Sequence, residues 1–504
     1  MSQRIDFPPQ LSINDIIQAL KKYSRPAEIE TVLLAYEMAN NAHANQRRKS
    51  GEPYIVHLLA TAYILVSMKI DASIVTAAIL HDVPEDTTVT IEEIEKNFGA
   101  DVASMIRGVT KLGKLKYRGV ERYIENLRKM FVAMAEDVRV MIIKFADRIH
   151  NLSTLQYLEP SKRQRVALES LEIYAPIAHR LGMGEFKGLL EDLAFPYMYP
   201  KEYERTIAIR DQLAQDGEGY IDRVIEVVRK ELKESGINYI DLHGRKKQLY
   251  SFYQKLAKKN WEANKIYDII ALRVIIADIA DCYAALGVIH KIWKPLKGRI
   301  KDYTAQPKPN GYKSLHTTVF CLDGKAVEFQ IRTKEMHYEA EFGVAAHWHY
   351  DDSGIKLPAK EIQWAKEFAQ IQQDILVNMA DLEDLKVDFF KSRIFTFTPK
   401  GDVIDLPEDA TPVDFAYHIH SEIGNKCSGA KVNDKMVSLD TALQSGDVVE
   451  IVVDKNRKTP NGEWLKSVKT HLAKSHIKNR LRANSLKDWF QSFIPTKKKK
   501  NTGG

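Results

Sequence analysis

Four residues in the first third of this 504-residue chain could bind one metal ion together. They are His57, His81, Asp82 and Asp147, and apolar runs beside them could anchor each one. A set of imidazole and carboxylate ligands suits Mn²⁺, Fe²⁺ or Zn²⁺, and a larger share of carboxylates favours Mn²⁺. No cysteine lies near these residues, so the sequence does not indicate a structural zinc site.

An isolated His-Asp pair is more often a capped helix end than a metal site. Here three separate segments, residues 46–57, 77–87 and 142–155, supply candidate ligands, and their combination reverses that balance. We expect the apolar run that ends at Leu80 to be a buried helix, because such a helix would anchor the backbone beneath the site.

Two further acids, Glu85 and Asp86, lie four residues after His81 and Asp82. In a continuous helix they would share a face with those ligands, where a carboxylate could orient or deprotonate a metal-bound water. Pro84 disfavours helix in the residue before it, so the two acids could instead begin a turn. The sequence leaves both arrangements open.

A second group of residues, farther along the chain, suits a nucleotide polyphosphate. Asp268 and Glu328 lie in two β-type runs, 268–276 and 325–331, and two carboxylates on adjacent strands can hold Mg²⁺ against phosphates. The surrounding sequence is rich in cations, namely Arg245, Lys247, Lys255, Arg273, Lys301 and Lys308, and also contains His316. Tyr312 follows an Asn-Gly turn signal, so a base could stack on its ring.

Each feature of this second group has an ordinary alternative. A run of charges is usually a solvated face, and a tyrosine after a turn is usually half-buried surface. Combined with paired carboxylates, they favour phosphoryl-type transfer. The chain contains neither GxxxxGK[ST] nor GxGxxG, which argues against a P-loop NTPase, a dinucleotide-binding fold and a protein kinase.

The order of several motifs resembles that of the long RelA/SpoT homologues, which synthesise and hydrolyse the alarmone (p)ppGpp. The motifs are RRKSGEPY, HDVPEDT, ADRIHN, DYTAQPKPNGYKSLHTTV, VEFQIRT and GVAAHWHY, and the match covers nearly all of residues 25–453. The resemblance implies a multidomain protein of α and α+β class. It would comprise an all-α HD-type hydrolase domain, a mixed α/β nucleotidyltransferase-like synthetase domain and a small β-grasp TGS domain.

The resemblance also implies roles for individual residues. In the hydrolase, the ligands of Mn²⁺ would be His57, His81, Asp82 and Asp147. The attacking water would be oriented or deprotonated by Glu85 and Asp86. The nucleotide would be bound by Arg48, Lys49, Asn151 and Thr154. In the synthetase, ATP would be bound by Arg245, Lys247, Arg273 and Lys301, and further nucleotide contacts would come from Ser251 and Lys255. Mg²⁺ would be held by Asp268 and Glu328, the guanine would stack on Tyr312, and the acceptor's phosphates would meet Lys308, Asn310 and His316.

A short motif indicates that both activities are present. Residues 299–302 read Arg-Ile-Lys-Asp, which resembles the R-x-K-D of bifunctional long members rather than the acidic E-x-D-D of synthetase-only ones. The implied reactions are ATP-dependent pyrophosphate transfer to the 3′-hydroxyl of GDP or GTP, with Glu328 activating that hydroxyl, and metal-dependent hydrolysis of the 3′-pyrophosphate of (p)ppGpp. The alternatives are a one-way enzyme with a single live site and a TGS-based regulator that binds ribosomes or tRNA.

The C-terminal part of the chain predicts a binding module. Residues 394–453 have the short alternating runs and turns of a β-grasp domain. They resemble a TGS domain in which His420 would lie near the end of an uncharged tRNA, although an ordinary helix residue is an equal alternative. Residues 455–504 hold 14 Lys/Arg and two acids, a net charge of +12, whereas the whole chain carries +7.

This basic segment also contains aromatic residues, namely Trp464, Trp489, Phe490 and Phe493. Cations that neutralise phosphates and aromatic faces that stack on bases suit contact with RNA or the ribosome. For residues 495–504 a solubilising, disordered end is the preferred interpretation.

Length and composition predict about three domains. We expect the hydrolase over residues 1–200, the synthetase over 201–360, a helical linker over 361–391, the TGS domain over 392–454, and a basic helical segment with a tail over 455–504. No apolar run approaches the roughly 18 residues of a membrane helix. Cys282, Cys321 and Cys427 form no CxxC, which fits a reducing cytoplasm.

Overall fold

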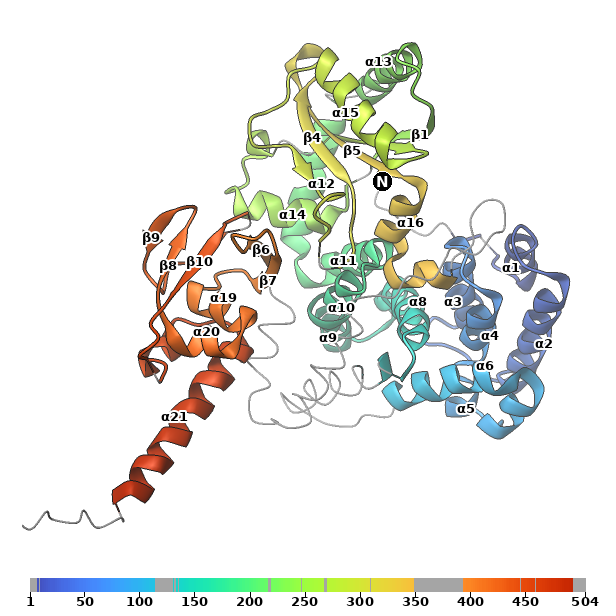
Figure 1. Ribbon diagram of the computed structural model, residues 1–504. Coiled ribbons are helices and arrows are strands. Elements are labelled where there is room, and N and C mark those ends of the chain that lie inside the picture. The colour runs from blue at the N-terminus through green and yellow to red at the C-terminus, as the bar shows by residue number, and fades with distance from the viewer. Residues whose placement is uncertain are drawn as a thin grey trace, which may run out of the picture. The chain divides into compact units, whose positions relative to one another are not determined.

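The computed structural model describes residues 7–492, except positions 9, 114–129, 131–132, 135, 216–218, 246, 267–269, 309, 349–392, 445 and 458. Asp268, the expected linker over 361–391 and the tail beyond residue 492 therefore lie outside the described residues. The chain forms two compact units, residues 1–374 and 375–504 (Figure 1).

The first unit begins with a series of helices. They are α1 (Ile13–Leu20), α2 (Pro26–Ala42), α3 (Ile55–Ser67), α4 (Ala72–Leu80), α5 (Val83–Asp86), α6 (Ile91–Gly113), α8 (Arg139–Ser153), α9 (Pro160–Glu169), α10 (Ala175–Arg180), α11 (Gly184–Met198) and α12 (Pro200–Gln215). Helices α3 and α4 are almost wholly apolar and are buried. The run that ends at Leu80 is thus the buried helix expected from the sequence, and Asp71 caps its N-terminus by accepting a hydrogen bond from the Ser73 amide.

A five-stranded mixed sheet follows, with strand order β1-β2-β5-β4-β3. The strands are β1 (Tyr239–Gly244), β2 (Ala271–Ile276), β3 (Lys301–Asp302), β4 (Leu315–Phe320) and β5 (Ala326–Thr333). Strands β2 and β5 are parallel neighbours, and the other pairs are antiparallel. The two β-type runs of the sequence are therefore adjacent strands, as expected.

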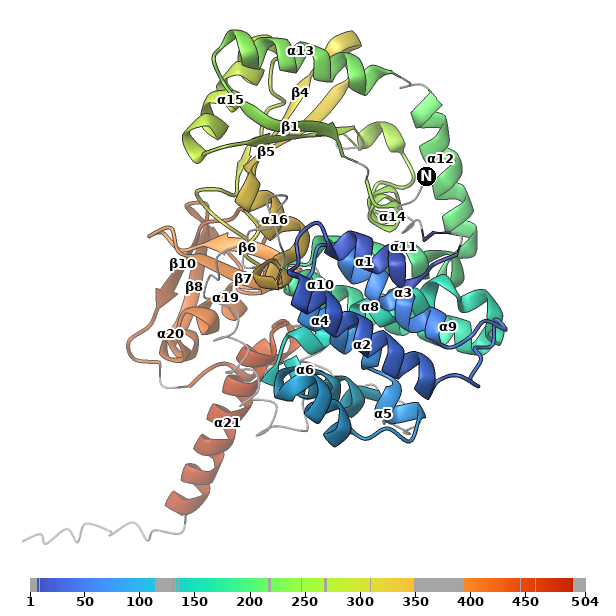
Figure 2. The same ribbon diagram turned by 90° about the vertical axis from the view of Figure 1, so that its right-hand side faces the viewer.

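Side chains alternate between the two faces of this sheet. Helices α13 (Tyr220–Glu234) and α15 (Ile279–Ile292) cover one face, where Val327, Phe329 and Ile331 of β5 enter the apolar core (Figure 2). The alternate residues Glu328 and Gln330 consequently lie on the opposite face. Helices α14 (Leu249–Lys258) and α16 (Lys334–Phe342) lie on that side, and η5 (Gly343–Trp348) follows α16.

Hydrogen bonds cross the boundary that we expected at residue 200. The Asp192 carboxylate on α11 accepts hydrogen bonds from the amides of Leu249 and Tyr250, at 3.1 and 2.9 Å, and so caps the N-terminus of α14. The Val344 amide donates to the Leu181 carbonyl at 3.0 Å. Helix α11, at the end of the expected hydrolase region, thereby holds a helix of the expected synthetase region in place.

The second unit has the elements of a β-grasp fold. They are β6 (Arg393–Phe397), β7 (Val403–Pro407), α19 (Pro412–Ile419), α20 (Ser421–Lys426), β8 (Cys427–Val432), β9 (Lys435–Val437), β10 (Val449–Val453), η7 (Gly462–Lys466) and α21 (His471–Ser492). A hairpin of β6 and β7 turns at Gly401, whose φ of 92° needs a residue without a Cβ. A parallel bridge between Phe397 and Val448 connects this hairpin to the antiparallel strands β10-β8-β9.

One expectation for the basic segment is wrong. Trp464 does not offer its ring to RNA, because it is 7% exposed in a core with Val413 and Tyr417 of α19. The buried Asp414 carboxylate accepts hydrogen bonds from the backbone amides of Lys469 and Thr470, which fixes the segment against α19. The side chains of Trp489, Phe490 and Phe493 lie outside the described residues.

In the part of the chain that the structure describes, no helix has both the length and the apolar character needed to span a membrane. Cys282, Cys321 and Cys427 are buried thiols without a disulfide bond.

Candidate functional sites

The predicted metal ligands meet in the helical part of the first unit. His57 projects from α3, His81 follows the end of α4, and Asp147 lies on α8; one ligand atom from each lies within 4.8 Å of the others, and all three residues are buried. Asp82 joins them, with its two carboxylate oxygens 3.2 Å from His81 Nε2 and 3.5 Å from His57 Nε2. The four side chains therefore converge on one point.

The hydrogen bonds of the two histidines fit a bound cation. His81 donates from Nδ1 to the Ala78 carbonyl at 2.6 Å, which leaves Nε2 as the nitrogen with a lone pair. That Nε2 is buried and makes no hydrogen bond among the described residues. His57 Nδ1 lies 2.8 Å from His150 Nδ1, so its Nε2 is likewise left for the site. Metal-binding histidines commonly use one nitrogen for the ion and the other for such a contact.

Neighbouring hydrogen-bond donors and charges keep the carboxylates in the ionised form that ligands require. Lys144 Nζ donates to Asp147 Oδ2 at 2.7 Å, and Asn151 donates to Asp147 Oδ1 at 2.5 Å. Burial raises the pKa of Asp147, but Lys144 and His57 outweigh burial and hold it well below its usual value. The pKa of Asp82 is also lowered despite burial, because of His81 and His57. The donor set fits a divalent cation, and its identity stays a prediction.

Glu85 and Asp86 occupy neither of the two arrangements that the sequence left open. Helix α4 ends before them, and they belong to α5, a separate single turn in which Pro84 stands near the N-terminus and costs no hydrogen bond. The Tyr54 hydroxyl lies 2.8 Å from Asp82 Oδ2 and 3.1 Å from Asp86 Oδ2, so its single hydrogen lies between the two carboxylates. Burial raises the pKa of Glu85, which makes it a better proton acceptor than an exposed carboxylate.

The residues expected to hold the hydrolase nucleotide border the same point. Arg48 donates to Asn151 Oδ1 at 2.6 Å and lies 2.9 Å from His150 Nδ1. Lys49 is exposed in the same turn, and Thr154 caps the end of α8 with its hydroxyl 3.2 Å from the His150 carbonyl. Our sequence reasoning missed His150, although it stands one turn after Asp147 on α8 and so had to share that ligand's face.

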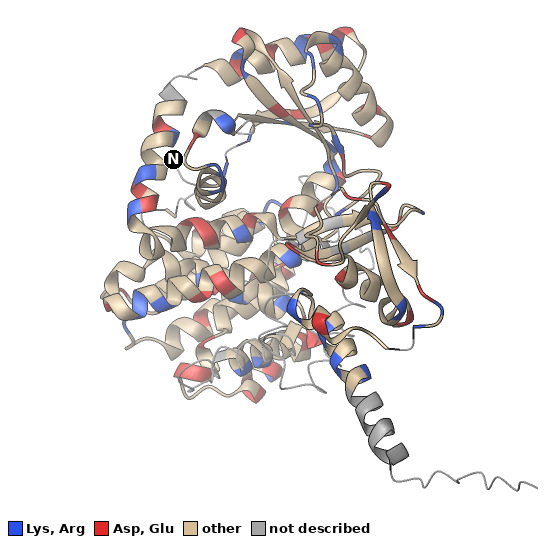
Figure 3. Cartoon of the chain, turned by 90° about the vertical axis from the view of Figure 1, so that its left-hand side faces the viewer, with Lys and Arg blue, Asp and Glu red and all other residues tan. Residues whose placement is uncertain are grey.

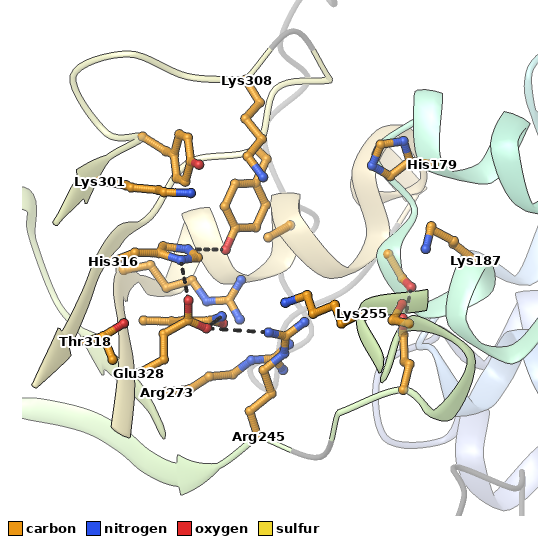
Figure 4. A pocket seen from close by; sticks show the side chains of 18 of the residues that line it. His179, Lys187, Arg245, Lys255, Arg273, Lys301, Lys308, His316, Thr318 and Glu328 are labelled. Atoms are coloured by element: carbon orange, nitrogen blue, oxygen red, sulfur yellow. Dashed lines mark hydrogen bonds and ion pairs between the residues drawn. The ribbon is translucent and has the colours of Figure 1, made fainter. Parts of the chain in front are cut away.

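A second site is a cavity of about 570 Å³ on the polar face of the sheet, facing α11, α14 and α16 (Figure 4). Ten of the residues predicted for the synthetase line it: Arg245, Ser251, Lys255, Arg273, Lys301, Lys308, Asn310, Tyr312, His316 and Glu328. Lys247 is not among the lining residues, because its ammonium lies over the Phe252 ring, 5.8 Å from the ring centre. Asp268 lies outside the described residues.

The cavity is strongly electropositive. Among the described residues, its walls hold two glutamates, Glu328 and Glu341, and eleven cations: Lys187, Arg245, Lys255, Lys258, Lys259, Lys265, Arg273, Arg299, Lys301, Lys308 and Arg332. Figure 3 shows charges of both signs spread over the helices of the chain, so this excess of one sign is a local feature. Such a wall suits a ligand with several phosphates.

Glu328 is held at the centre of the strand face. Its Oε2 accepts a hydrogen bond from Gln330 at 2.8 Å and lies 3.8 Å from an Arg245 nitrogen, while its Oε1 lies 3.4 Å from His316 Nδ1. On β2 the residue opposite Glu328 is Ala271. A carboxylate fixed by neutral and cationic donors, and open to the cavity, can accept a proton or bind a cation.

Tyr312 is anchored through its hydroxyl rather than projecting freely. The hydroxyl lies 2.8 Å from His316 Nε2, and Lys308 Nζ stands 4.9 Å from the ring centre. Lys308 also contacts the Tyr303 ring at 4.6 Å. Burial and the neighbouring Lys301 lower the pKa of Lys308 to about 8, so its charge is weakly stabilised until an anion arrives.

The strand alternation identifies pocket residues that we missed. Gln330 and Arg332 follow Glu328 at a spacing of two on β5, and Thr318 pairs with Glu328 across β4. Arg332 is 1% exposed, and its guanidinium lies 3.2 Å from Glu341, which also pairs with Arg273 at 2.7 Å. This acid therefore sets the position of Arg273, one of the predicted ATP contacts.

His420 lies on the surface of the second unit, between α19 and α20. It is exposed, and its Nδ1 accepts a hydrogen bond from the Glu422 amide at 3.2 Å, as an N-cap residue does. It is thus a cap at a helix junction rather than a residue within a helix.

Three family descriptions match separate parts of the chain. An HD domain matches residues 35–184, a region found in RelA / SpoT proteins matches residues 244–355, and a TGS domain matches residues 394–453. These three ranges contain, in turn, the His/His/Asp cluster, most of the residues that line the cavity, and the β-grasp unit.

Full-length relatives match almost the whole chain. A guanosine-3′,5′-bis(diphosphate) 3′-pyrophosphohydrolase of Aquifex aeolicus is 44% identical over 93% of this chain and 66% of its own length. A GTP pyrophosphokinase of Myxococcus xanthus is 43% identical, over 91% and 61%. The bifunctional (p)ppGpp synthase/hydrolase SpoT of Escherichia coli is 42% identical, over 94% and 67%. The chain thus spans two thirds or less of the length of most of these relatives, and on this similarity it belongs to the RelA/SpoT family.

Proposed function

We propose that this protein both makes and degrades (p)ppGpp. It would transfer pyrophosphate from ATP to the 3′-hydroxyl of GDP or GTP at the cavity, and hydrolyse the 3′-pyrophosphate of (p)ppGpp at the helical cluster. The observation that supports this most is the presence, on one chain, of a buried His/His/Asp cluster and a separate cavity whose described lining includes eleven cations.

The two activities divide between parts of the chain. We assign hydrolysis to residues 1–200 and synthesis to residues 201–360, followed by a linker over 361–391, a TGS module over 392–454 and a basic segment over 455–504. The boundary at residue 200 does not fully separate the two sites, because residues of α11 also line the cavity.

In synthesis, the side chains act by position and charge. Arg245, Lys255 and Arg273 would neutralise the phosphates of ATP, while Lys308 would receive those of the acceptor. Glu328, oriented by Gln330, would accept the proton of the 3′-hydroxyl as that oxygen attacks the β-phosphorus of ATP and AMP leaves. Mg²⁺, held by Glu328 and Asp268, would supply further charge neutralisation.

In hydrolysis, the cluster would act on a water molecule. Mn²⁺ held by His57, His81, Asp82 and Asp147 would polarise that water when bound. Glu85, with its raised pKa, would take its proton, and Asp86 would stay oriented through Tyr54. Arg48 and Asn151, already joined to each other, would hold the nucleotide so that its 3′-pyrophosphate meets the water.

The second unit suits recognition of the translation machinery. His420 is exposed, and the segment after residue 454 is basic, so uncharged tRNA and the ribosome are the proposed partners. Deleting residues 394–504 should weaken sedimentation with ribosomes, and His420→Ala should weaken tRNA binding with the fold intact. Unchanged binding in both variants would remove this proposal.

Paired incubations test the main proposal. The purified protein is incubated with ATP, GDP and Mg²⁺, and separately with ppGpp and Mn²⁺, and guanine nucleotides are followed by ion-exchange chromatography. Product in both reactions supports the bifunctional enzyme. Product in only one identifies a one-way enzyme, and product in neither, with ribosomes and uncharged tRNA also present, favours a regulator that acts by binding.

A further inference from the structure

The cavity has a wall that the synthetase region does not supply. His179, at the end of α10, and Lys187, in the first turn of α11, both line the cavity, yet neither lies within the matched region 244–355. Figure 4 shows both on the helical side of the opening, across from the strand residues His316 and Glu328.

This wall is locked to the loop that carries Lys308. The Asn310 side chain donates a hydrogen bond to the His179 carbonyl at 3.2 Å. A Cβ added at Gly182 would lie 3.0 Å from the Asn310 carbonyl oxygen, so the two backbones touch here. The turn before α11 and the loop around Lys308 therefore form one continuous surface.

Positively charged side chains of this surface lie near His179. Its side chain is exposed and lines the cavity. Partial desolvation of the ring in the cavity wall, and then the charges of Lys187, Lys308 and Arg180, lower the pKa of His179. At neutral pH the imidazole is consequently neutral, with one N–H able to donate. Lys187 is fixed by its contact with the buried Glu191, at 2.7 Å, so its ammonium is positioned before any ligand binds.

Two ammonium groups and a neutral imidazole that line the same part of the cavity suit a phosphate group. ATP is expected on the other side of the cavity, near Arg245 and Arg273 on the strand face. The His179 carbonyl accepts a hydrogen bond from Asn310, and the charge of Lys308 acts on the His179 ring. Asn310 and Lys308 are both expected contacts of the acceptor nucleotide. We propose that Lys187 and His179 bind the terminal 5′-phosphate of the acceptor nucleotide and so favour GTP over shorter acceptors. This rests on the proposed synthesis.

The test compares acceptors of different phosphate number. KM and kcat are measured for GTP, GDP and ATP with the wild type, Lys187→Gln and Lys187→Arg, with the exposed Lys201→Gln on α12 as the matched loss of one charge. Because a charge-assisted hydrogen bond to phosphate is lost, KM for GTP should rise roughly tenfold in Lys187→Gln. KM for GDP should rise less, KM for ATP and kcat should hold, and Lys187→Arg should recover most of the affinity.

A larger effect on ATP than on GTP, or equal KM values for all nucleotides in Lys187→Gln and wild type, would overturn the inference. Equilibrium dialysis with GTP alone gives a readout that needs no turnover: Lys187→Gln should bind GTP more weakly than Lys201→Gln does. Hydrolysis of ppGpp and the melting temperature report on folding. If the wild type makes no (p)ppGpp, the proposed function is wrong. The dialysis would still show whether Lys187 contributes to the binding of GTP.

Discussion

The two sites of the first unit differ in how they balance charge. At the helical cluster, two histidines and two acids face one another, and Lys144 compensates Asp147 within hydrogen-bond distance. At the cavity, eleven cations face two acids among the residues that the structure describes. The first site has a nearly balanced donor set that fits one small cation, whereas the second has an excess of positive charge that suits polyphosphates. On the proposed function, the cluster would hold a resident metal ion and the cavity would bind the phosphates of the substrates.

The largest expected contrast concerns metal retention. Four protein ligands at the cluster should keep their ion through gel filtration in metal-free buffer, while Mg²⁺ at the cavity should be lost, because it is held mainly by phosphates and water. Hydrolysis should persist without added metal and synthesis should fall by at least about 10²-fold. Mass spectrometry of the metal content should find one ion per chain; equal losses of both activities would contradict this difference between the two sites.

Salt should separate the sites next. Raising the ionic strength from about 0.05 to 0.3 M shortens the range over which charges act, so KM for GTP in synthesis should rise several-fold. Hydrolysis should change less, because the cluster's charges are buried and paired. Steady-state kinetics at fixed free Mg²⁺ measures both, and a greater response of hydrolysis would contradict the assignment of the cationic cavity to synthesis.

The pH dependence of acceptor binding should reveal Lys308. Its pKa is lowered to about 8, so its charge is present below that pH and is lost as the pH rises through it. KM for GDP should therefore increase above pH 8, by up to tenfold per unit. Lys308→Arg should flatten the profile, because arginine stays charged. An identical rise in that variant would assign the titration to another group.

The smallest effect should come from Asp192, which caps α14 and so positions Ser251 and Lys255. Asp192→Ala should destabilise the first unit by about 1 kcal/mol and raise KM for ATP a few-fold, because the helix end loses its acceptor. Asp192→Asn should retain most of the cap. Thermal unfolding and ATP kinetics measure both effects, and full activity in the alanine variant would show that the cap does not position α14.

Local sequence patterns predicted several elements of the fold and several residues of the candidate sites. The apolar run before His81 required a buried helix, and the alternation of β5 required Glu328 to share a face with Gln330 and Arg332, although we extracted only Glu328 from it. Helix α5 was not foreseen, because Pro84 can either end a helix or start one. Tertiary contacts determine the remaining features: Trp464 is buried by α19, and Lys187 reaches the cavity only because α11 packs beside α14.

On the proposed function, two separate sites on one chain carry opposite reactions. The most direct test measures synthesis and hydrolysis side by side in the wild type, Asp82→Ala and Glu328→Ala. Loss of a metal ligand or of the proton acceptor should cost its own reaction about 10²-fold or more and leave the other within about twofold. Loss of both activities in either folded variant would contradict the two-site account.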